Sequence, residues 1–212
     1  MNISIALKTL LGTAALTLPL MASAASTYTT GTGALSASAT VNFTVVIPQV
    51  LYLRVGTGST YTTGSYLTNA STDLITFTLA AGTSGNGTAV AGTGGDLNNG
   101  VETAAVVSNG GNVTLVATSA AAGLSDGNGD FIPFTQITTA ASALTGTYTL
   151  LPAPVLANGT SASVLLTASA AKVVQADAKW TFGYANTTAY ASGTYGGVGV
   201  NNSLVTYTAT MP

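Results

Sequence analysis

The chain has 212 residues, of which only 5% are Asp, Glu, Lys or Arg, and its formal net charge at pH 7 is −2. Ordinary soluble domains carry about 25% charged residues, and neither sign clusters along this sequence, which excludes an electrostatic surface for nucleic acid or anionic lipid. The chain contains no Cys and no His. It therefore lacks the ligands of zinc, copper and haem sites, a thiol nucleophile and the usual general base, and we expect no enzyme activity.

Residues 1–24 have the pattern of a secretory signal peptide. Lys8 precedes an apolar run, and Ala22-Ser23-Ala24 meets the small-residue rule for cleavage. The apolar run is shorter than the roughly 20 residues that span a bilayer. We therefore expect an exported protein, secreted or held at the cell surface, without a transmembrane segment after cleavage. N-terminal sequencing of the exported form should start near Ala25, and an intact Met1 would contradict this expectation.

The most regular segment of the chain is residues 35–55. Apolar residues occupy the odd positions from Leu35 to Ile47, and Ser, Thr or Asn occupies most even positions. Side chains alternate between the two faces of a strand, so this pattern predicts one long strand with an apolar face. Pro48 interrupts the ladder, and the apolar pattern then resumes up to Val55. Residues 25–33, ahead of this strand, are expected to form a flexible lead-in to a single domain, 25–212.

Shorter alternating segments follow along the rest of the chain. They predict strands at residues 74–79, 101–107, 113–117, 132–137, 144–151, 163–168, 180–184 and 205–211. Asn109-Gly110-Gly111 predicts a tight hairpin, and only residues 169–178 suggest a helical turn. Long Gly/Asn/Thr-rich loops separate the strands. The pattern is typical of an all-β protein, an Ig-like antiparallel β-sandwich.

One loop has the oxygen-rich spacing of a calcium site. Asp126, Asn128 and Asp130 stand at alternate positions, as in calcium loops. The EF-hand pattern fails, however, because Phe131 and Ile137 stand where it requires Gly and Glu. Two interpretations stay open, a looser surface calcium site and an ordinary tight turn. We expect no other cofactor.

The aromatic residues Trp180, Phe182 and Tyr184 share one strand face. They could form a sugar-stacking platform, but such a row more often belongs to a core, and we favour the core. Seven Asn-x-Ser/Thr sequons also occur in the mature chain, and we favour a bacterial source in which they are unused. The sequons are at Asn42, Asn69, Asn86, Asn112, Asn158, Asn186 and Asn201.

The two ends of the mature chain carry a family resemblance. A long alternating strand near the N-terminus, Gly193-Thr194-Tyr195, and a closing strand at residues 204–209 together resemble bacterial fimbrial subunits, in particular chaperone–usher pilins and the spore-coat-U-like branch. The chain departs from that pattern in having no cysteines and in ending with Met211-Pro212. The resemblance implies an Ig-like sandwich that lacks one strand, completed by the N-terminal extension of the next subunit, and a periplasmic chaperone as partner. The assembly residues would be Val41, Phe43, Val45, Ile47, Val205 and Tyr207.

These observations predict a structural subunit of a fimbria-like or surface assembly that self-associates through strand pairing. An adhesin-like module that binds glycan or protein through its loops is the alternative, and a Thr-rich ice- or crystal-binding face is a third hypothesis. The segment around Phe43 has two interpretations, a strand that completes a neighbour's sheet or a core strand of its own domain. We favour the core strand, because Leu51, Leu53 and Val55 follow it directly.

Overall fold

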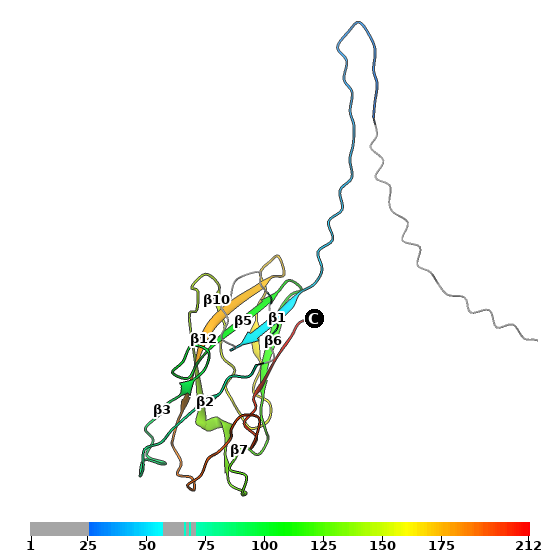
Figure 1. Ribbon diagram of the computed structural model, residues 1–212. Coiled ribbons are helices and arrows are strands. Elements are labelled where there is room, and N and C mark those ends of the chain that lie inside the picture. Colours follow the sequence, from blue (N-terminus) through cyan, green and yellow to red (C-terminus); the bar gives the residue numbers. More distant parts are fainter. Residues whose placement is uncertain (1–25, 57–65, 67, 69–70) are drawn as a thin grey trace, which may run out of the picture. The chain divides into compact units, whose positions relative to one another are not determined.

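The computed structural model describes residues 26–56, 66, 68 and 71–212, so the expected signal peptide, residues 1–24, lies outside the described residues. The chain divides into two units, Met1–Ile47 and Pro48–Pro212. The second unit, called the body below, contains all the named strands (Figure 1). Within the described part of the chain, no helix has the length and hydrophobicity needed to cross a membrane.

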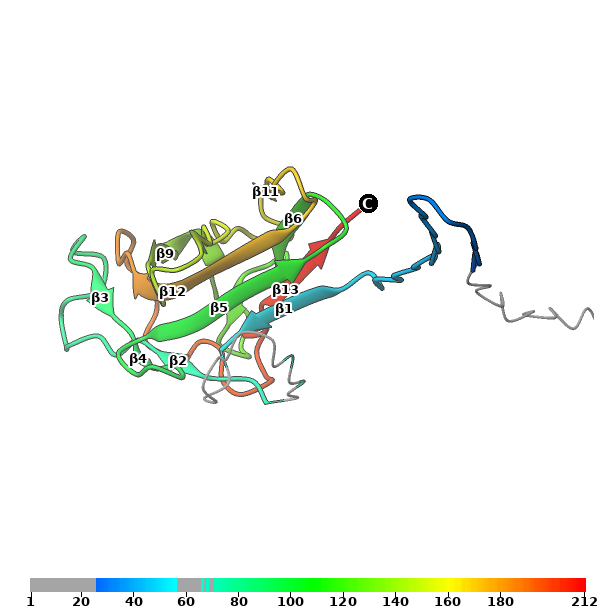
Figure 2. The ribbon, with the colours of Figure 1, turned by 90° about the horizontal axis from the view of Figure 1, so that it is seen from above.

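The larger sheet of the body has six strands built around two long ones. Its strands are β1 (Leu51–Val55), β3 (Val90–Ala91), β5 (Val101–Ser108), β9 (Ile137–Ser142), β10 (Thr149–Leu150) and β12 (Val174–Tyr184). β5 lies between β1 and β12 and pairs antiparallel with both (Figure 2). β12 pairs on its other side with β9 and with β10. Almost every residue of β5 is buried, as expected for a central strand that is covered on both faces.

The second sheet has three strands, with β6 in the centre. Its strands are β6 (Val113–Thr118), β11 (Val164–Leu166) and β13 (Thr206–Thr210). Short elements complete the body: β2 (Ile75–Thr76), β4 (Thr93–Gly94), β7 (Leu124–Ser125), β8 (Phe131–Ile132) and a 3-10 turn, Phe134–Gln136. The alternation of apolar and polar residues along β6 gives the sheet one buried face, because successive side chains point to opposite sides.

The two sheets enclose one hydrophobic core. Val113 and Leu115 of β6 face Ala104, Val106 and Trp180 of the larger sheet in a single cluster of buried residues. The ring of Trp180 packs 5.2 Å from that of a β13 tyrosine, so the two layers are in direct contact. The predicted all-β sandwich is therefore confirmed.

The predicted hairpin through Asn109-Gly110-Gly111 is wrong. The strands on its two sides, β5 and β6, lie in different sheets and do not pair. Both edges of β5 are occupied by β1 and β12, and both edges of β6 by β11 and β13. The turn therefore carries the chain from one layer of the sandwich to the other.

The predicted helical turn over residues 169–178 is also wrong, except at its start. Lys172 N donates to Ser169 O at 2.8 Å, which closes a single turn. Lys172 itself has a φ of 61°, outside the helical region. Strand β12 begins at Val174, because its alternating side chains enter the core between the sheets.

The single long strand predicted for residues 35–55 does not form. Only Leu51–Val55 is a strand of the body, whereas residues 41–47 have no regular secondary structure. Phe43, Val45 and Ile47 are 88%, 81% and 76% exposed. The interpretation that this segment is a core strand of its own domain is therefore wrong for these three residues. Pro48 stands at the boundary between the two units.

Candidate assembly surface

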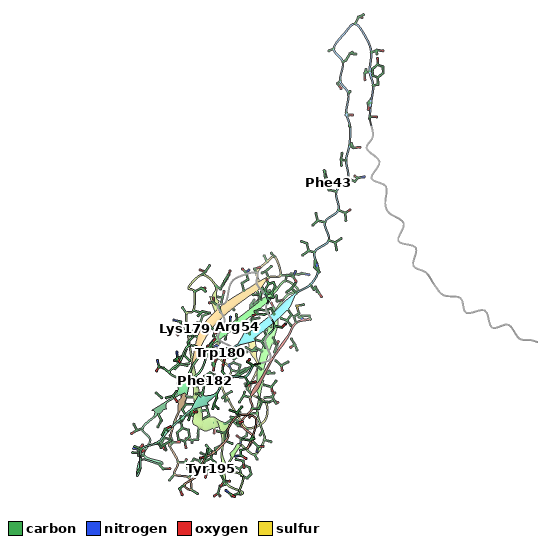
Figure 3. All side chains as sticks on the ribbon, viewed as in Figure 1. Phe43, Arg54, Lys179, Trp180, Phe182 and Tyr195 are labelled. Atoms are coloured by element: carbon green, nitrogen blue, oxygen red, sulfur yellow. The ribbon has the colours of Figure 1, made fainter. Side chains whose placement is uncertain are left out.

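The N-terminal unit presents an uncovered row of apolar side chains. Val41, Phe43, Val45 and Ile47 all lie at odd positions and are all exposed. Figure 3 shows Phe43 on the extended segment. An extended segment with one exposed apolar face has the properties of a strand without a sheet, because no named strand of the described residues pairs with it.

The start of the same unit folds back on itself. Thr27 Oγ1 donates to Ser38 O at 2.9 Å, and Thr29 Oγ1 donates to Ser36 O at 3.3 Å. The chain turns between them around residues 32–33 (Figure 1). The expected flexible lead-in, 25–33, is therefore one arm of this folded-back segment over its described residues. The exposed row at residues 41–47 begins after the last of these contacts.

In the body, β1 and β13 form an open side of the sandwich. Among the described residues, β13 pairs only with β6, and β1 pairs only with β5. The inward-facing Val113 and Leu115 of β6 are fully buried, whereas Val205, Tyr207 and Ala209 at β13 are only partly buried. β1 and β13 lie beside each other but in different sheets. Within the described residues each therefore has one edge without a paired strand, and the N–H and C=O groups of such an edge can pair with an added strand.

The C-terminal end of β1 lies in a buried group of charged residues that the sequence did not reveal. Arg54 Nη2 lies 3.5 Å from Asp96 Oδ2, and Arg54 Nε donates to Gly56 O at 2.9 Å. Glu102 Oε2 accepts from Asp96 N at 3.2 Å, and the Glu102 and Asp73 side chains are hydrogen-bonded. We call Arg54, Asp73, Asp96 and Glu102 the carboxyl cluster. The expectation that charges do not cluster holds along the sequence but is wrong in three dimensions.

The carboxyl cluster has an unusual proton affinity. Burial raises the pKa of Glu102 to about 8, and the negative charges of Asp73 and Asp96 add to this rise, although the N–H of Asp96 opposes it. On β13, burial and then the charge of Glu102 raise the pKa of Tyr207. The charge of Glu102, on β5, therefore acts on Tyr207 of β13, which belongs to the other sheet.

The candidate calcium loop forms an exposed turn between β7 and β8. Asp126 Oδ1 accepts from Asn128 N at 2.8 Å and from Asp130 N at 3.0 Å. The Asn128 N–H, the larger cause, and the Asp130 N–H lower the pKa of Asp126. Asp126 thus stabilises the turn with its own carboxylate, as in Asx turns. The calcium site at Asp126, Asn128 and Asp130 stays a prediction.

The aromatic row belongs to the core. Trp180, Phe182 and Tyr184 are all buried on the inner face of β12. Trp180 Nε1 donates to Leu151 O at 2.9 Å, which satisfies the one polar group of this side chain. Figure 3 shows Trp180 and Phe182 inside the body. The interpretation as core is confirmed, and these rings do not form a sugar-stacking platform.

The sequon at Asn186 has a structural role. Asn186 is 1% exposed, and its Nδ2 donates to Thr83 O at 2.8 Å and to Asn86 Oδ1 at 2.9 Å. Its Oδ1 accepts from Gly85 N at 2.8 Å. A glycan on this amide would displace these bonds, so Asn186 holds the Gly-rich loop around Gly85 to the body.

Comparisons of this chain with protein-family models, with curated proteins and with solved structures find no match. The features that bear on function are therefore the exposed row of residues 41–47 and the open edge of the sandwich.

Proposed function

We propose that this chain is an exported structural subunit of a bacterial fimbria-like or surface assembly, and that it self-associates through strand pairing. The observation that supports this proposal is the exposed apolar row at Val41, Phe43, Val45 and Ile47. A monomer gains nothing from such a row, because apolar side chains in water lose the free energy of burial. The body supplies the complementary feature, a β-sandwich with partly buried side chains along β13, and the proposal takes it as an Ig-like sandwich that lacks one strand.

Strand addition would satisfy both parts at once. Residues 41–47 of one copy would pair with the edge of β13 or β1 in the next copy, and their side chains would cover Tyr207 and the residues beside it. Each large apolar side chain moved from water into an apolar groove contributes about 1.5–3 kcal/mol. Before assembly, an exposed edge of this kind promotes aggregation, which gives a periplasmic chaperone a role as a partner during export.

The experiment compares Phe43→Asp with Thr44→Asp in the exported protein. Phe43→Asp would place a charge in the apolar groove of the neighbour, so polymers seen by electron microscopy should disappear, while circular dichroism should show a folded monomer. Thr44→Asp adds the same charge at the adjacent position and should reduce polymer formation much less. Polymers that persist in Phe43→Asp, or a wild-type protein that stays monomeric at high concentration, would exclude strand pairing through this segment.

An adhesin-like binding module is the second candidate. The observation that favours it is an open hollow of about 370 Å³ lined by Ala120 and residues 199–204. Val200 and Leu204 in this lining are exposed, and so is the neighbouring Val198. This function predicts that Val200→Asp abolishes binding of the protein to glycan- or protein-coated surfaces while polymer formation is unchanged. The structural function predicts the opposite dependence, with assembly lost in Phe43→Asp and unaffected by Val200→Asp.

A further inference from the structure

The carboxyl cluster joins several separate segments at one buried place. Arg54 and Gly56 come from the end of β1, Asp73 precedes β2, and Asp96 and Glu102 lie before and within β5. Gly56 N donates to Thr103 O at 2.7 Å, and Thr103 N donates to Asp96 Oδ1 at 2.7 Å. The end of β1 is thus held to β5 by the bond between Gly56 and Thr103, and the N–H of Thr103 is bonded to a carboxylate of the cluster. This connection is independent of the proposed assembly function.

The packing around Gly56 brings two of the carboxylates together. A β-carbon added at Gly56 would lie 2.5 Å from Asp73 Oδ2 and 2.5 Å from Glu102 Oε2, so both oxygens pack against its α-carbon. Gly56 also has a φ of +72°, which favours glycine. Two ionised carboxylates that pack against the same α-carbon repel each other, whereas one protonated and one ionised carboxyl form a hydrogen bond.

The other charged and titratable groups facing Glu102 do not remove this repulsion. Asp96, from the loop before β5, is negative, and Tyr207, from β13, is neutral below its raised pKa. Arg54, from β1, is the one cation of the cluster, and it contacts Asp96 and Thr103 in addition to Gly56. With every group ionised, three carboxylates would face one guanidinium, a net charge of −2 in a buried site.

We propose that Glu102 and Asp73 form a proton-dependent latch, in which one shared proton holds the end of β1 against β5 and its loss lets this end open. In the latched state Glu102 is protonated and donates to the Asp73 carboxyl. In the open state Glu102 is hydrated and ionises with its ordinary pKa. The device senses pH without histidine, because burial and a second carboxylate shift an acidic group into the neutral range.

The direction of the pH dependence follows from proton linkage. The pKa of Glu102 is about 8 in the latched state and 4.5, the ordinary value, when the group is hydrated. The proton therefore favours the latched state. Its contribution is complete below pH 4.5, decreases as the pH rises, and is lost above pH 8.

The first test is a direct titration of Glu102. Glu102 is the only glutamate in the chain, so protein labelled with carboxyl-13C glutamate gives a single side-chain signal. We expect its midpoint at about pH 8, and a midpoint near the ordinary value of 4.5 would overturn the proposal. Asp73→Asn should lower the midpoint, because it removes the neighbouring charge. The matched control, Asp126→Asn, changes a carboxyl in the exposed turn and should leave the midpoint in place.

The second test measures opening of the latch through trypsin cleavage at Arg54. Cleavage at the exposed Lys172 in the same digest serves as the reference, because it corrects for the pH dependence of trypsin itself. In the wild type the ratio of Arg54 to Lys172 cleavage should rise about tenfold from pH 7 to pH 9. This is the change in the opening equilibrium that proton linkage gives for a Glu102 pKa of about 8 in the latched state and 4.5 in the open state. In Glu102→Gln, which cannot ionise, the ratio should stay constant. A wild-type ratio that is constant with pH, or a Glu102→Gln ratio that rises equally, would contradict the latch.

Discussion

Two segments of this chain have the same alternating pattern but differ in exposure. In β6, Val113, Leu115 and Ala117 alternate with polar or outward-facing residues and are fully buried. In the N-terminal unit, Phe43, Val45 and Ile47 alternate in the same way and are exposed. The difference lies in the partners, because β6 has β11 on one edge and β13 on the other. Residues 41–47 belong to no sheet in the part of the chain that the structure describes.

This comparison shows what an alternating pattern encodes. Alternation determines which side chains share a face, and therefore whether a segment is suited to a sheet with one buried side. It does not determine whether the sheet belongs to the same molecule. An exposed segment with the pattern of a central strand is therefore evidence for an intermolecular partner.

The largest expected effect is at Leu115, in the centre of β6. Leu115→Asp removes a fully buried side chain and places a carboxylate between the two sheets. The loss of burial and the cost of the charge together should exceed about 4 kcal/mol, enough to unfold the body or nearly so. Chemical denaturation followed by tryptophan fluorescence measures this loss, since Trp180 is the only tryptophan. Thr118→Asp, at an exposed position on β6, is the control and should change stability little. A folded Leu115→Asp protein would contradict the described core.

An intermediate effect is expected at Tyr207 on the open edge. Tyr207→Ala removes the ring that packs 5.2 Å from Trp180, but the site is already partly open to solvent. We expect a loss of about 2–3 kcal/mol in the isolated subunit, below the 3–5 kcal/mol typical of a fully buried aromatic residue. Thr208→Ala, on the outward face of β13, should cost less than about 0.5 kcal/mol. A loss of stability in Tyr207→Ala as large as that in Leu115→Asp would show that Tyr207 is fully buried in the isolated subunit and that this edge is not open.

Trypsin distinguishes ordered from exposed backbone near the same edge. After the expected signal peptide, trypsin can cleave the chain only at Arg54, Lys172 and Lys179. Arg54 is buried in β1, and Lys179 lies in β12 between paired strands. Lys172 is exposed on a turn. At pH 7 the body should be largely resistant, and the first cut should follow Lys172, with cleavage at Arg54 at least about tenfold slower. Early cleavage after Arg54, detected by mass spectrometry, would show that β1 is not held to β5.

The sequence predicted well those features that depend on one face of one strand. The alternation at Trp180, Phe182 and Tyr184 placed them correctly in the core. The pairing of strands could not be predicted in the same way. Asn109-Gly110-Gly111 is equally suited to a hairpin and to a turn between layers, and the choice depends on which strands occupy the edges of β5 and β6.

The carboxyl cluster could not be predicted because its members are distant in sequence. Arg54, Asp73 and Glu102 come from three segments that the topology brings together. The only local signal was the spacing of Asp96 and Glu102 across a Gly/Asn-rich turn. The candidate assembly residues show a related limit. Alternation identified Phe43 and Val45 as one face, but their exposure depends on which strands the body already contains.

The smallest expected effect is that of Phe43→Ala on the stability of the monomer. Phe43 is 88% exposed, so its ring buries little apolar area in the monomer, and removing the ring loses little burial. At about 25 cal/mol per Å² the change in the free energy of unfolding should stay below about 0.5 kcal/mol. In an assembled sample the same substitution should cost about 3 kcal/mol or more per interface, because the ring would then occupy a groove. The paired measurement is denaturation of monomer against dissociation of polymer. A large loss in the monomer would place Phe43 in the core of its own subunit. Equal, small losses in both states would show that the ring is exposed in the polymer as well, and the pairing strand would then lie elsewhere in the chain.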